Sequence, residues 1–98
     1  MNIVYEYVNV SQSDRLESLL KELLDKLEKQ YPFIIRSDVF LKLDNDEQKR
    51  NHCGIRLSLK GPRIYASSNE TSFEEAIRET INDLKDQLEK RKSQMISH

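Results

Sequence analysis

The chain has 98 residues with a formal net charge of −1, which favours one small domain and gives no whole-molecule attraction to nucleic acid. No apolar run approaches the roughly 20 residues that span a bilayer, so no membrane partner is expected. The lone cysteine excludes an internal disulfide and the N-terminus lacks a signal-peptide pattern, so we expect a cytoplasmic protein.

The first element is predicted to be a strand from Ile3 to Val10, where β-branched and aromatic residues dominate. Both of its faces carry apolar side chains, and we favour Ile3 and Tyr5 as the inward pair.

A helix is predicted next, with Ser11 as its N-cap and Asp14 at the capping-box position. Its apolar residues recur at three- and four-residue steps. They are Leu16, Leu19, Leu20, Leu23, Leu24 and Leu27, and Tyr31 extends the stripe. Pro32 ends the helix, because proline disfavours helical geometry in the residue before it.

In the middle of the chain the apolar period changes to two, which predicts three strands, the first from Ile35 to Leu43. The residues expected to point inward are Val39, Leu41, Leu43, Ile55, Leu57, Leu59, Ile64 and Ala66. A polar loop at 44–49 separates the first two strands. Lys60-Gly61-Pro62-Arg63 is a tight-turn signal between the last two.

A second helix is predicted from Ser72 to Lys92. Ser72 with Glu75 forms a capping box, and Thr71 with Glu74 offers the same pairing one residue earlier. The apolar stripe consists of Phe73, Ala76, Ile77, Thr80, Ile81, Leu84 and Leu88. Acids at the start and bases at the end match the helix dipole. We expect one domain over residues 1–93 and a disordered tail over 94–98.

The order β-α-β-β-β-α predicts an α+β two-layer sandwich, a four-stranded sheet with two helices packed on one face. The other sheet face would stay in water and present Phe40, Lys42, Arg56, Ser58, Arg63 and Tyr65. Aromatic and basic side chains together mimic a platform for stacking single-stranded bases. Cross-strand pairing on a solvated face explains the same residues and is the explanation that we favour from the sequence.

Few residues suggest a catalytic or metal-binding site. His52-Cys53 is a possible metal pair, but a site needs three or four ligands and the others are absent. No nucleophile with a neighbouring base stands out, and no glycine-rich phosphate loop is present. We therefore expect no cofactor, no metal, no small-molecule substrate and no enzymatic activity. Oligomeric state is left open.

Two basic helix ends frame the β-rich middle of the chain. The first helix closes with Lys26-Leu27-Glu28-Lys29, and Gly61 precedes Ile64-x-Ala66. The second helix begins with Phe73-Glu74-Glu75-Ala76-Ile77 and ends with Gln87-Leu88-x-Lys90. In order and spacing these features resemble the ribosome hibernation-promoting factors, also called ribosome-associated inhibitors and sigma-modulation proteins.

The resemblance implies a domain similar to a double-stranded-RNA-binding fold. Such a domain would lodge in the decoding region of the small ribosomal subunit, contact rRNA and block the tRNA and mRNA sites, as a hibernation factor under stress. The RNA-binding positions that it implies are Lys26, Lys29, Lys42, Lys85, Lys90, Arg91 and Lys92. Longer members add a C-terminal domain that pairs two ribosomes, and we expect this chain to act without one.

Two positions depart from the family pattern. Asp83 and Asp86 stand where members commonly carry lysine or arginine, and each removes a phosphate contact. The alternative function is therefore a diverged protein–protein interaction module with weak or no RNA binding. The basic residues also have simpler explanations, because a cationic helix end complements the dipole and Lys26 can pair with Glu22.

Overall fold

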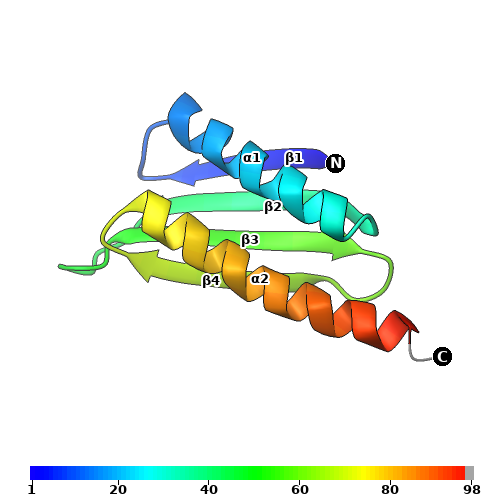
Figure 1. Cartoon of the computed structure of the whole chain (residues 1–98). Helices are drawn as coiled ribbons and strands as arrows, with labels where there is room; N and C mark the ends of the chain where they lie inside the picture. Colours follow the sequence, from blue (N-terminus) through cyan, green and yellow to red (C-terminus); the bar gives the residue numbers. More distant parts are fainter. Residues whose placement is uncertain (97–98) are drawn as a thin grey trace.

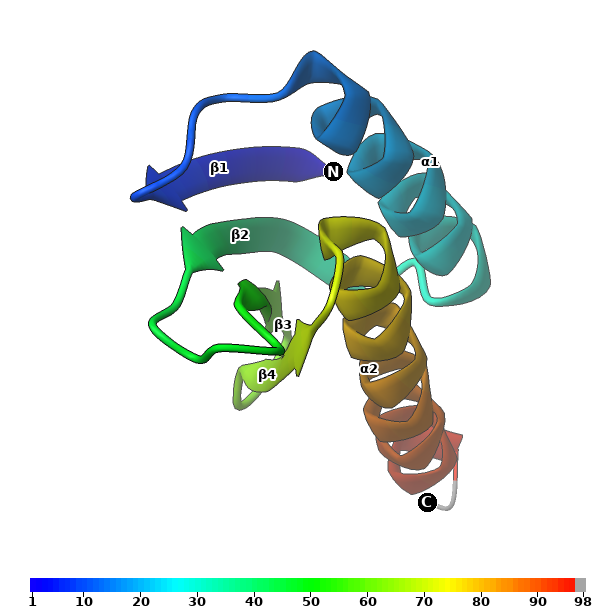
Figure 2. The same cartoon turned by 90° about the vertical axis from the view of Figure 1, so that its left-hand side faces the viewer.

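The computed structural model describes residues 1–96 and arranges them in two layers (Figure 1). The elements are β1 (Asn2–Val8), α1 (Asp14–Gln30), β2 (Ile34–Leu43), β3 (Asn51–Leu59), β4 (Ile64–Glu70) and α2 (Phe73–Ile96). The strands lie in the order β1-β2-β3-β4, with β1 parallel to β2 and the other neighbours antiparallel. Both helices cover the same face of the sheet (Figure 2). The predicted α+β sandwich and its element order are confirmed.

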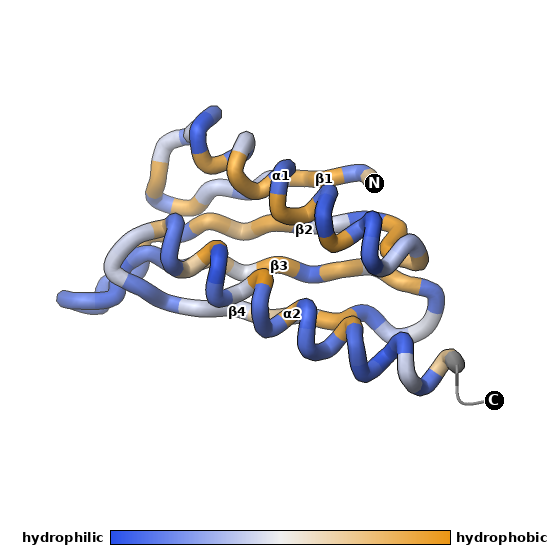
Figure 3. The backbone as a smooth tube through the Cα atoms, viewed as in Figure 1, coloured by the Kyte–Doolittle hydropathy of each residue, from blue (hydrophilic) through white to orange (hydrophobic). Residues whose placement is uncertain are grey.

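The core lies between the helix layer and the inward face of the sheet, where the apolar stripes meet (Figure 3). The leucine stripe of α1 and the mixed stripe of α2 are buried against alternate residues of β2, β3 and β4. On β1, Ile3 and Tyr5 pack against this core, whereas Val4 and Val8 are each 39% exposed, so the favoured orientation is confirmed.

The connection from β1 to α1 differs from the prediction. The strand ends at Val8, and Asn9 follows with a φ of 58°, a left-handed conformation that asparagine tolerates. The prediction of Ser11 as N-cap is wrong: α1 begins at Asp14 and Ser13 is the cap. The Ser13 hydroxyl accepts a hydrogen bond from the Leu16 amide at 3.2 Å. The left-handed turn shifts the helix start by two residues.

The start of α2 agrees with the prediction, because the Ser72 hydroxyl accepts from the Glu75 amide at 3.2 Å. Its end does not, since the helix continues past Lys92 to Ile96 and includes residues expected in a disordered tail. Residues 93–96 contain no glycine or proline that would stop a helix. Ser97 and His98 lie outside the described residues.

Candidate nucleic-acid interface

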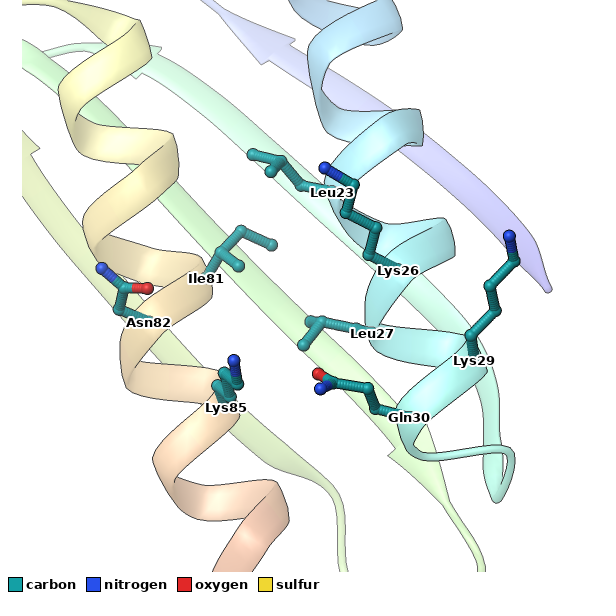
Figure 4. A pocket seen from close by; sticks show the side chains of 8 residues that line it. All are labelled: Leu23, Lys26, Leu27, Lys29, Gln30, Ile81, Asn82 and Lys85. Atoms are coloured by element: carbon teal, nitrogen blue, oxygen red, sulfur yellow. The ribbon is translucent and has the colours of Figure 1, made fainter.

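A groove runs between the end of α1 and the middle of α2 (Figure 4). Its volume is about 460 Å³. The lining residues are Leu23, Lys26, Leu27, Lys29, Gln30, Ile81, Asn82 and Lys85. Three of the seven predicted RNA-binding residues are therefore brought together from two helices. The amides of Gln30 and Asn82 were not predicted as site residues, because helical period alone does not say which flank of a helix faces its neighbour.

The three groove lysines differ in how their charges are compensated. Lys26 lies 3.5 Å from the Glu22 carboxylate, an exposed pair of the kind worth only tenths of a kcal/mol. Within residues 1–96, Lys29 and Lys85 make no ion pair. In Figure 4 the Lys29 side chain extends away from α2, whereas Lys26 lies on the side of the groove. Lys85, and Lys26 with its weak exposed pair, are thus the cations that an external anion at the groove can bind.

Lys92 lies near the same end of α1, because its ammonium is 5.9 Å from the centre of the Tyr31 ring. Tyr31 is the C-cap of α1 and is only 3% exposed. Its hydroxyl donates a hydrogen bond to the Glu89 carboxylate at 2.6 Å, and this bond, together with burial, raises the pKa of Tyr31 to about 12. The tyrosine joins the two helices and places Lys92 beside the groove end.

The remaining predicted residues do not join this group. The Arg91 guanidinium donates to the Pro62 carbonyl at 3.0 Å, which ties it to the turn between β3 and β4. Lys42 lies on the sheet, 3.4 Å from the Asp44 carboxylate. Lys90 is exposed, and helical geometry places it about 140° around α2 from Lys85. The seven predicted RNA-binding residues therefore divide into two groups. Four lie at or near the groove (Lys26, Lys29, Lys85 and Lys92), and three lie elsewhere.

The two acidic departures lie about 60° apart around α2. Asp86 is close enough to Tyr31 to contribute to the raised pKa of that residue, so its charge acts on the groove side. Asp83 is about 160° around the helix from Lys85. Both side chains are exposed. Of the two acids, we therefore expect Asp86 to oppose an anion at the groove more strongly.

The possible metal pair, His52 and Cys53, is divided between the two faces of β3. Cys53 is buried and faces the core, so its neighbour in the strand, His52, points to the opposite face. Burial raises the pKa of the Cys53 thiol to about 12, which keeps it protonated and unreactive. Residues 1–96 contain no cluster of three or more His, Cys, Asp or Glu that could hold a metal ion. They also contain no helix long and apolar enough to cross a membrane.

Two solved structures share this fold. A ribosomal subunit interface protein from Coxiella burnetii superposes with a TM-score of 0.85 at 19% identity, covering 95% of this chain and 99% of that one. The Thermus thermophilus Protein Y N-terminal domain gives a TM-score of 0.79, also at 19% identity, covering 92% and 98%.

At the level of sequence, no curated protein matches the chain. The model of one ribosome-associated family does match, over residues 3–96, and it confirms the resemblance described above. That match spans nearly the whole sequence, so the chain belongs to the family described as Sigma 54 modulation protein / S30EA ribosomal protein.

Proposed function

We propose that this protein binds the small ribosomal subunit in the cytoplasm through its helix layer, and that the bound domain blocks the tRNA and mRNA sites. The proposal is one of binding and steric occlusion, without catalysis. The observation that carries it is the position of Lys26 and Lys85 on the two sides of one groove, with Lys85 unpaired within residues 1–96. Lys29 lines the α1 end of the groove and extends its charge away from α2. Lys92 adds a fourth cation beside the end of α1.

The expected mechanism is electrostatic with recognition by shape. Ribosomal RNA helices present phosphates and 2′-hydroxyls rather than readable base edges, so a rigid two-helix surface is suited to them. Each lysine that meets a phosphate releases counterions, which makes binding fall steeply with salt. Because the molecule as a whole is nearly neutral, local convergence of cations must supply this attraction.

The direct experiment is co-sedimentation of the protein with purified small subunits over a range of salt concentrations. Replacing Lys26, Lys29 and Lys85 by alanine is expected to reduce the salt slope by about two units. The matched control replaces Lys21, Lys49 and Lys60, which removes the same charge at positions outside the groove. Absence of parent binding at low salt, or equal losses in both triple variants, contradicts the proposal.

A protein–protein interaction module is the second candidate, and one observation favours it. Each helix carries one more acid than base, five against four in α1 and six against five in α2. Such a layer also suits a basic protein partner. A pull-down from stationary-phase lysate separates the two candidates, because recovery of rRNA supports the first and its absence, with a protein recovered, supports the second.

A further inference from the structure

The sheet face opposite the helices carries an ordered set of side chains. Strand register places Val4, Asp38, Arg56 and Tyr65 in one row across all four strands. Glu6, Phe40, Gly54 and Ser67 form the neighbouring row. Alternation along each strand points both rows away from the core. This face is open in the two-layer fold (Figure 2).

Tyr65 lies across the middle of this face, above Gly54. A Cβ atom added at Gly54 would clash with the Tyr65 hydroxyl oxygen and would lie 3.2 Å from the ring carbon that bears it. Only glycine therefore lets the phenol rest on β3. The Tyr65 side chain is nevertheless 50% exposed, and no hydrogen bond to its hydroxyl is found within residues 1–96. The ring is a supported aromatic surface that remains open to solvent.

A second aromatic ring adjoins it. Phe40 is the cross-strand partner of Gly54, so it lies on the far side of the glycine from β4. The Arg56 guanidinium lies 5.6 Å from the centre of the Phe40 ring, in cation–π contact. Tyr65, Phe40 and Arg56, with Gly54 beneath, form one contiguous patch that we name the aromatic platform.

The platform adjoins a small cluster of positive charge on the same face. Asp38 is only 6% exposed, and two guanidinium groups cover it, Arg36 at 2.9 Å and Arg56 at 3.4 Å. One carboxylate against two cations leaves this cluster positive. Lys42, paired with Asp44, and Glu6, beside Phe40, lie on the same face. Within the four strands, the outward positions carry three bases, Arg36, Lys42 and Arg56, against two acids, Glu6 and Asp38, whereas both helices are slightly acidic. Positive charge and exposed aromatic surface thus coincide.

We propose that the aromatic platform binds unpaired nucleotides of single-stranded RNA. A base would stack on the Tyr65 ring, and neighbouring phosphates would contact Arg36, Arg56 and Lys42. Stacking on aromatic side chains combined with basic residues along the backbone is how sequence-tolerant single-strand binders work. RNA is the expected strand because the family is ribosome-associated. The choice of RNA thus rests on the same family as the proposed function, but the platform and the helix groove are on opposite faces, so binding at each can be tested separately.

The chain contains no tryptophan, which allows a direct test. Tyr65→Trp introduces the only indole, and its fluorescence reports stacking of a base on that position. Titration with an unstructured single-stranded RNA of about 12 nucleotides is expected to quench the emission saturably. The same sequence in a fully paired RNA duplex, whose bases are not free to stack, is expected to give little quenching. Unchanged emission with the single strand, or equal quenching by the duplex, overturns the proposal.

Affinity measurements by fluorescence anisotropy, with the RNA labelled, supply the second test. Tyr65→Leu removes the ring and is expected to weaken binding about tenfold, whereas Tyr65→Phe keeps the ring and binds as the parent does. Met95→Ser is the control, since Met95 is 46% exposed but lies near the end of α2. If Tyr65→Leu binds as tightly as Met95→Ser, the platform is not the RNA site.

Discussion

Tyr31 connects the two helices through a single hydroxyl. It closes α1, its ring is buried, and it donates to Glu89 on α2 at 2.6 Å. Tyr31→Phe removes this bond and is expected to lower the free energy of unfolding by about 1 kcal/mol. Urea denaturation at neutral pH measures the change. Tyr65→Phe is the matched control, because no hydrogen bond to the Tyr65 hydroxyl is found in residues 1–96, and it should leave stability unchanged. Equal losses in both variants contradict the assigned role.

The acids at positions 83 and 86 offer a second residue-scale test. Both acids depart from the family pattern in the same way. Of the two, only Asp86 contributes to the raised pKa of Tyr31 at the groove end. Asp86→Arg is therefore expected to tighten binding to small subunits and to steepen the salt slope by about one unit. Asp83→Arg should have a smaller effect, because Asp83 lies about 160° around α2 from Lys85, whereas Asp86 lies about 100° from it. Co-sedimentation over a salt series compares them, and a larger effect of Asp83→Arg means that the groove is not the RNA-facing surface.

At the scale of elements, the start of α1 tests which serine is the cap. Ser13 accepts a hydrogen bond from the Leu16 amide, whereas Ser11 is exposed in the preceding loop. Ser13→Ala is expected to cost about 1 kcal/mol of stability, and Ser11→Ala close to nothing. Thermal denaturation followed by circular dichroism measures both. A loss of stability confined to Ser11→Ala would mean that Ser11 is the N-cap, as the sequence predicts.

The existence and order of the elements could be predicted because apolar period is local. The leucine stripe of α1 and the alternation in β3 are patterns that each segment carries by itself. The cap could not be chosen, since two serines stand two residues apart and the left-handed turn at Asn9 decides between them. The division of the basic residues between the groove and other surfaces could not be predicted either. Lys92 and Arg91 are neighbours in sequence, yet one reaches Tyr31 and the other reaches Pro62, because adjacent helix positions point about 100° apart.

At the scale of the whole molecule, three protonated groups lie where elements meet. Tyr7 of β1 donates to the Glu17 carboxylate of α1 at 2.6 Å, and Tyr31 joins α1 to α2. Cys53 of β3 is buried in the core. Burial, with the Glu17 bond, raises the pKa of Tyr7 to about 12, and the pKa of Tyr31 reaches a similar value chiefly through its bond to Glu89. Each group must stay neutral for its contacts to persist.

These raised pKa values predict a loss of stability at alkaline pH. The unfolded chain releases a tyrosine proton near its ordinary pKa of 10.0, whereas the folded chain holds it to about 12. The stabilisation is therefore complete below pH 10 and is lost as the pH rises from 10 to 12. The Cys53 thiol acts in the same direction from its ordinary value of 9.0.

Thermal denaturation between pH 7 and pH 12 tests this expectation. The parent should lose stability progressively above pH 9, and the double variant Tyr7→Phe, Tyr31→Phe should start less stable at neutral pH but lose less above pH 10. Deprotonation of lysines also weakens the fold in this range, but it affects parent and variant alike, so the difference between their curves isolates the tyrosines. Parallel curves for the two proteins would mean that the folded chain does not hold these protons more tightly than the unfolded chain does.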